Sequence, residues 1–211
     1  MHFSTSNERE LGSGQSHSLP PLKRFNHYRP SPTAAKPLPT LAALLTYKTW
    51  GIPMPPECHF TCYTTFLDNL LKLAPYPARF PLVLIAATYI SRLREVFPEA
   101  SGEEGVEVRL FKTAFVLAWK VYGAEADGEM MCGRGRVARE MEREFLKGIN
   151  YTLQVSPMDI FKLAATTKIL VSQNPKLFTG KDCMEVALWV EDLNMGIVES
   201  GGLNGWSGGV S

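Results

Sequence analysis

The chain has 211 residues, of which 45% are hydrophobic and 20% are charged, and its 22 basic and 21 acidic side chains nearly cancel. This length and composition predict one globular domain with tails. A net charge of +1 provides no broad basic surface, so we do not expect nucleic acid as a partner. The longest apolar run, Phe80 to Ile90, has about half the length that a bilayer requires, so we expect no membrane span.

The first fifteen residues are polar and contain no apolar stretch of the kind found in signal peptides. We therefore expect an intracellular protein, located in the nucleus, the cytoplasm or both. In that setting cysteines are normally reduced, so we expect thiols rather than a disulfide framework. The four cysteines are Cys58, Cys62, Cys132 and Cys183.

Proline and glycine divide the chain into three parts. Residues 1–39 are rich in serine, proline and other polar residues and are predicted to form a disordered tail. Within this tail Ser31, which precedes Pro32, is a candidate for phosphorylation by a proline-directed kinase. Residues 195–211 hold six of the seventeen glycines and are predicted to be a flexible tail. Residues 40–194 remain as a single folded domain.

The first half of this domain has helical periodicity. One stripe with spacings of three and four predicts a helix that ends before Pro75 and Pro77. It consists of Phe60, Tyr63, Leu67, Leu70, Leu71 and Ala74. A second helix is predicted from Phe80 to Phe97. A third spans Val106 to Tyr122, and its six consecutive apolar residues from Ala114 to Trp119 predict the central, fully surrounded helix of the domain.

The second half is also helical in pattern. Residues 136–153 carry an apolar stripe formed by Met141, Phe145, Leu146 and Ile149. Ser156, Pro157 and Asp159 together are typical of a helix start, with a hydroxyl cap, a proline in the first turn and an early acid. That helix continues to Val171, and a last one is predicted around residues 186–193. No segment alternates as a strand does, so the predicted fold class is all-α.

Few residues have the type and spacing that catalysis requires. None of the four histidines follows His59, so the helical region has no histidine of its own for a catalytic triad. A phosphate-binding glycine loop is also missing from the sequence. We therefore expect neither an enzyme nor a bound cofactor.

Cys58, His59 and Cys62 are the best candidates for a metal site. Zinc takes four ligands, and a fourth would have to come from a distant cysteine. The favoured interpretation is that Cys58 and Cys62 are partly buried residues one helical turn apart, with His59 at the surface. On that interpretation no metal is bound.

Three segments resemble parts of a cyclin box. Tyr89-Ile90-Ser91-Arg92-Leu93 is similar to the tyrosine-isoleucine-aspartate-arginine stretch of its second helix. Residues 109–120 are similar to its buried third helix, and residues 141–153 resemble its fifth helix and the exit from it. The resemblance covers residues 58–161 and is closest to single-box fungal cyclins of the phosphate-signalling type. It implies a five-helix bundle around a central apolar helix, here flanked by helices at 40–50 and 182–194.

The resemblance also implies a partner and a site. In the family, the lysine that ends the third helix and a glutamate of the fifth helix face a cyclin-dependent protein kinase, and they correspond here to Lys120 and Glu142. The chain would then be a regulatory subunit that binds and activates such a kinase. A charged pair beside apolar surface can fix the register of a partner. Alternatively, Lys120 only interacts with the negative end of its own helix and Glu142 is solvated.

Two features differ from the family pattern. Ser91 replaces the aspartate of the second-helix motif, and the segment 121–136 contains four glycines where the family has a short fourth helix. The glycines leave open a degenerate cyclin-fold scaffold that does not activate a kinase. A cyclin-fold nucleic-acid-binding protein is the other alternative, because four arginines cluster at one helix start, although glutamates interleave with them. These are Arg134, Arg136, Arg139 and Arg143.

Overall fold

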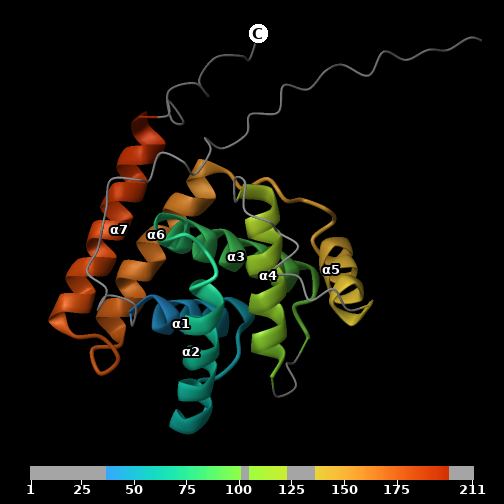
Figure 1. Ribbon diagram of the computed structural model, residues 1–211, viewed down its shortest axis with the longest axis horizontal. Coiled ribbons are helices and arrows are strands. Elements are labelled where there is room, and N and C mark those ends of the chain that lie inside the picture. The colour runs from blue at the N-terminus through green and yellow to red at the C-terminus, as the bar shows by residue number, and fades with distance from the viewer. Residues whose placement is uncertain (1–36, 101–104, 123–135, 200–211) are drawn as a thin grey trace, which may run out of the picture.

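The computed structural model describes residues 37–100, 105–122 and 136–199, with side chains as far as residue 195, and every regular element in these ranges is an α-helix (Figure 1). The helices are α1 (Pro37–Trp50), α2 (Glu57–Leu71), α3 (Tyr76–Val96), α4 (Val106–Tyr122), α5 (Arg136–Gly148), α6 (Pro157–Gln173) and α7 (Gly180–Glu199). The described part of the chain contains no strand, which confirms the predicted all-α class. Among the described helices, none has both the length and the apolar character needed to cross a bilayer.

Helix α1 belongs to the core and does not merely flank it. Eleven of its fourteen residues are buried, and it packs against α2, α3 and α6. It begins at Pro37, three residues before the predicted start of the domain, because proline fits the first turn of a helix without losing a hydrogen bond. At the other end of the domain α7 continues to Glu199, beyond the predicted end at 194.

Helix α3 occupies the centre of the molecule. Every residue from Phe80 to Ile90 is buried, and the helix contacts α1, α4, α5 and α6. It starts at Tyr76, earlier than predicted, because Pro77 lies in its first turn. The prediction that α4 would be central is therefore wrong: its run from Ala114 to Trp119 is buried, but Lys112 and Lys120 keep one side exposed.

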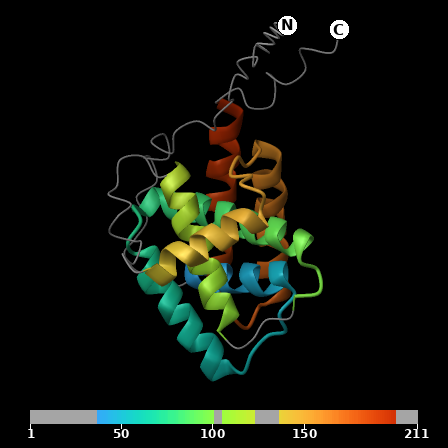
Figure 2. The same ribbon diagram turned by 90° about the vertical axis from the view of Figure 1, so that its right-hand side faces the viewer.

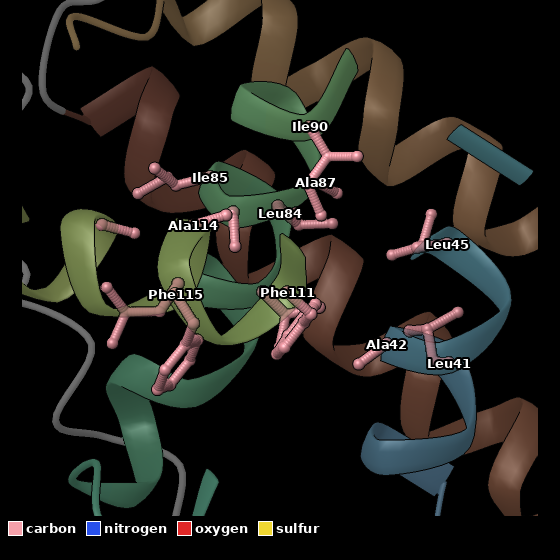
Figure 3. Packing of buried hydrophobic residues seen from close by; sticks show 14 of the residues in the cluster. Leu41, Ala42, Leu45, Leu84, Ile85, Ala87, Ile90, Phe111, Ala114 and Phe115 are labelled. Carbon is pink, nitrogen blue, oxygen red and sulfur yellow. The ribbon is translucent and has the colours of Figure 1, made fainter. Parts of the chain in front are cut away.

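The core between α1, α3 and α4 is formed by aliphatic and aromatic side chains that point toward one another (Figure 3). Phe111 and Phe115 of α4 stack with ring centroids 5.8 Å apart, and both are fully buried. Leu41 and Leu45 of α1 are also almost fully buried. Burying such side chains contributes about 2 kcal/mol each, so this three-helix contact is a main source of stability.

The remaining helices lie on two sides of this centre. Helices α6 and α7 pack together, and Trp189 of α7 lies against Phe80 of α3 with ring centroids 5.4 Å apart. On the opposite side of Figure 1 is α5, which crosses α3 and α4 in Figure 2 and contacts both. The apolar residues predicted for α2 and α7 are all buried.

Candidate partner-binding site

Lys120 and Glu142 meet in space although 22 residues separate them in the chain. Lys120 lies in the last turn of α4 and Glu142 in the middle of α5, and Nζ of the lysine is 2.5 Å from Oε2 of the glutamate. The lysine side chain is 37% exposed and the glutamate side chain 16%. The alternative in which Glu142 is simply solvated is therefore wrong, because its carboxylate accepts a hydrogen bond from another helix.

The position of α5 depends on a close approach to α3. Phe145 is buried, and Met141 and Leu146 are half-buried on the same side of α5. At the end of this helix, a Cβ atom added to Gly148 would lie 2.3 Å from Cδ1 of Leu93, closer than carbon atoms can approach. An alanine at this position would force the side chain of Leu93 to move, so the glycine favours the close packing of α5 against α3.

Helix α5 ends earlier than predicted, at Gly148 and not at residue 153. Asn150 and Tyr151 have φ angles of 51° and 54°, in the left-handed region that reverses the chain direction after a helix. The N–H of Tyr151 donates to the carbonyl of Leu146 at 2.8 Å, which satisfies one of the last helical carbonyls.

The segment after α5 is held by side chains of α3 and α4. Tyr89 and Tyr122 both donate their phenolic O–H to the carbonyl of Leu153, at 2.7 and 3.1 Å. The oxygen of Tyr122 also accepts the N–H of Val155 at 2.9 Å. Burial raises the pKa of both phenols, which keeps them protonated as donors.

Arg92 adds a further contact to this segment. Its Nη1 donates to the carbonyl of Thr152 at 2.8 Å, and its Nη2 lies 3.5 Å from Oδ2 of Asp159. Asp159 and Ser156 form a reciprocal capping box, in which each side chain accepts the backbone N–H of the other residue. The helix start predicted at Ser156 is thus confirmed, and Arg92 connects it to α3.

Two exposed valines lie on the same two helices as the ion pair. Val121 follows Lys120 and is 44% exposed, and Val137 near the start of α5 is 67% exposed. An ion pair with so accessible a lysine contributes only about 0–1 kcal/mol to stability. An accessible charged pair of this kind can orient a partner that carries complementary charges.

The arginine cluster near the start of α5 does not form a purely basic face in the described residues. Arg136 pairs with Glu140 at 2.8 Å, and Lys147 pairs with Glu144 at 3.2 Å. These carboxylates are neighbours of Arg139 and Arg143 along the same helix. Arg134 lies outside the described residues. This alternation of signs is unfavourable for binding a phosphate backbone.

The cysteines of α2 are more exposed than predicted. Cys58 and Cys62 were expected to be partly buried, but both are exposed free thiols. His59, which lies beside Cys58, is exposed as expected. The buried side of α2 is already occupied by its aromatic and leucine side chains, which turns the cysteines outward. In the described residues no group of three metal-ligating side chains is gathered.

Two sequence predictions fall on residues that the structure does not describe. The candidate phosphorylation site Ser31 precedes α1 and lies outside the described residues. The same holds for residues 123–135, which make up most of the glycine-rich segment that differs from the cyclin pattern.

Tyr89, Arg92 and Tyr122 together form a clamp on the segment that follows α5, and the sequence did not predict it. The sequence places Tyr89 and Arg92 in the second-helix motif and Tyr122 at the end of a helix, and it predicts no contact for their side chains. The spacing of three residues does place Tyr89 and Arg92 on one face of α3, and this is the one feature of the sequence that could have indicated a shared contact. The carbonyls that they bond are about sixty residues further on, and the sequence offered no way to pair them.

Comparison with known proteins identifies no family for this chain: no family model, curated protein or solved structure matches it.

Proposed function

We propose that the chain is a cyclin-like regulatory subunit that binds a cyclin-dependent protein kinase through the surface around Lys120 and Glu142 and activates it. The observation that carries this proposal is the ion pair between the end of α4 and the middle of α5. These are the two residues that the resemblance assigned to the kinase interface. They lie on two separate helices, and more than a third of the lysine side chain remains accessible to a partner.

A second line of support comes from the segments that resemble the cyclin box. Tyr89 and Arg92 belong to the second-helix motif and bond the exit of α5, which belongs to the fifth-helix motif. The buried run of α4 packs against α3 between them. The three segments thus depend on one another for their positions, as parts of one functional unit would.

Activation by such a subunit is a shift in population. The subunit needs only to bind the active conformation of the kinase more tightly than the inactive one. A fixed charged pair suits this task because it recognises one orientation of the partner at little cost in ordering its own side chains.

The test is capture of a cyclin-dependent kinase from fungal cell extract by the immobilised full chain, followed by a kinase assay on a proline-directed substrate peptide. Three variants are compared with the wild type: Lys120→Glu, Glu142→Lys, and the double variant that exchanges the two charges. The double variant re-forms the ion pair with its polarity reversed, so it retains any structural role of the pair. It presents the wrong charges to a partner.

We expect the wild type to capture the kinase and raise its activity, and each single variant to lose most of the capture. The double variant is expected to regain wild-type stability but not binding. Recovery of capture in the double variant would mean that the pair acts only within this chain. Capture without increased activity would favour the scaffold alternative, and binding of duplex DNA without any kinase would favour the nucleic-acid alternative.

A further inference from the structure

Helix α7 has an exposed apolar stripe in addition to its buried face. Val186, Trp189, Val190 and Leu193 face the core and are almost fully buried. On the exposed surface of the same helix, Met184 is 69%, Leu188 is 40% and Met195 is 61% exposed. Single exposed apolar residues are common, but three on one stripe of one helix suggest a surface that a partner covers.

The spacing of this stripe is that of a coiled-coil seam. Its five residues are separated alternately by three and four positions, the pattern that lets two helices pack along their length. They are Lys181, Met184, Leu188, Glu191 and Met195, and all are exposed. The expected occupant is therefore another helix.

The two charged positions identify which helix fits. When a second copy of α7 lies antiparallel to the first, Lys181 lies opposite Glu191 of that copy and Met184 lies opposite Leu188. Two-fold symmetry repeats both contacts, which gives two opposite-charge pairs at the ends and apolar pairs between them. In a parallel arrangement Lys181 would lie opposite Lys181 of the second copy and Glu191 opposite its Glu191. Like charges opposite each other are unfavourable.

We propose that the chain forms an antiparallel homodimer through the exposed stripe of α7. This interface does not depend on the proposed kinase binding. Figure 1 shows α7 and α5 on opposite sides of the molecule, so the dimer leaves the surface around Lys120 and Glu142 open. The assembly would carry two such surfaces facing away from its centre.

The expected affinity is modest. The twenty residues of α7 extend over about 30 Å, which is shorter than the seams of most stable two-stranded coiled coils. Such a contact is at the small end of specific interfaces. The dimer must therefore be sought over a range of concentrations that reaches the high micromolar.

The test is sedimentation equilibrium of the full chain over that range, with four variants. Lys181→Glu and Glu191→Lys each place like charges at both ends of the antiparallel pair. The double variant exchanges the charges and restores two opposite-charge pairs. Lys162→Glu, which changes an exposed lysine on α6, is the matched control.

We expect the wild type and the control to dimerise alike, each single variant to raise the dissociation constant about tenfold, and the double variant to return to the wild-type value. Because Glu185 lies one turn from Lys181, helical content and thermal stability are measured for every variant. A wild type that stays monomeric throughout would overturn the proposal. So would a dimer that the single variants leave unchanged, or a double variant that fails to recover.

An equimolar mixture of the two single variants gives an independent readout. The Lys181→Glu chain has acidic residues at both charged stripe positions, and the Glu191→Lys chain has basic residues at both. The mixed dimer therefore contains only opposite-charge pairs. We expect the mixture to dimerise more tightly than either variant alone. Equal dissociation constants for the mixture and the separate variants would contradict the proposed pairing.

Discussion

Gly148 of α5 lies so close to Leu93 of α3 that a methyl group on the glycine would stand 2.3 Å from Cδ1 of the leucine. The ring of Phe97 lies 3.2 Å from the same point. Leu93 is buried, so its side chain has little room to move away. A side chain at this position would therefore either displace Leu93 or push α5 away from α3.

The variant Gly148→Ala is therefore expected to lower the free energy of unfolding by about 1–3 kcal/mol, the usual cost of overpacking. Urea unfolding followed by circular dichroism measures this change. Gly180→Ala is the control, because nothing lies within 4 Å of a Cβ atom at that position. If steric conflict is the cause, adding Leu93→Ala must reduce the effect of Gly148→Ala. Fully additive effects of the two substitutions would contradict it.

Tyr122→Phe is expected to destabilise the protein more than Tyr89→Phe. Removing the hydroxyl of Tyr122 takes a donor from Leu153 and also leaves the N–H of Val155 without its acceptor, at a cost of about 1–3 kcal/mol. Removing the hydroxyl of Tyr89 takes away only one donor to the carbonyl of Leu153, which keeps its hydrogen bond from Tyr122. Unfolding free energies of the two variants test this order, with Tyr151→Phe at an exposed phenol as the control.

The two substitutions are also expected to be non-additive. The double variant deprives the carbonyl of Leu153 of both phenolic donors. Its free energy of unfolding should therefore fall by more than the sum of the decreases in the two single variants. A double-variant cycle of unfolding free energies measures this coupling. A coupling of zero would mean that the carbonyl finds another donor, such as water, when either phenol is removed.

Glu185 is predicted to make the stability of the fold depend on pH. It is a buried carboxyl on α7 near the hydroxyl of Tyr76, at 3.4 Å, and burial raises its pKa above the ordinary 4.5. Asp182 raises this pKa further, while the hydrogen bond from Tyr76 and the charge of Lys181 lower it. Because the folded state binds the proton more tightly, this group favours folding at acidic pH. That contribution is lost as pH rises from 4.5 through the raised folded pKa.

Glu185→Gln is therefore expected to raise the free energy of unfolding at pH 7 and to remove this part of the pH dependence. The measurement is urea unfolding at intervals between pH 4 and pH 8 for the wild type and the variant. Glu95→Gln, at an exposed carboxyl of α3, is the control. An unchanged pH profile in Glu185→Gln would contradict this prediction, because it would mean that the carboxyl has the same pKa in the folded and unfolded states.

Ser156→Ala is expected to cost about 1 kcal/mol, since it removes the side-chain acceptor of the capping box at the start of α6. Thermal unfolding monitors the loss, and Ser172→Ala at an exposed position of the same helix is the control. Asp159→Asn tests the other half of the box. If both cap variants match the control, Arg92 and the clamp on the preceding segment must hold the helix start without the cap.

Most helices, and the faces that they bury, could be predicted from the sequence. The six apolar residues predicted for the first stripe and the four predicted for α7 are all buried, although Ala74 of that stripe lies beyond the end of α2 at Leu71, and the cap at Ser156 is present. These features depend on residues within a few positions of one another, so their spacing and capping chemistry are visible in the chain. The stripe of α7 that we propose as an interface was equally visible, but only exposure distinguishes it from a buried face.

The tertiary structure decided what depends on residues far apart in the chain. The apolar run of α4 indicated burial, but only packing shows that α3 has the central place and that α4 keeps one side exposed. The resemblance pointed to Lys120 and Glu142 as two charges that face a partner, and only the packing of α5 against α4 shows that they also bond to each other. The sequence by itself determined the buried apolar sides of α2 and α7, because local spacing encodes them. Which helices meet is determined by the combined packing of all the helices, which no local spacing encodes.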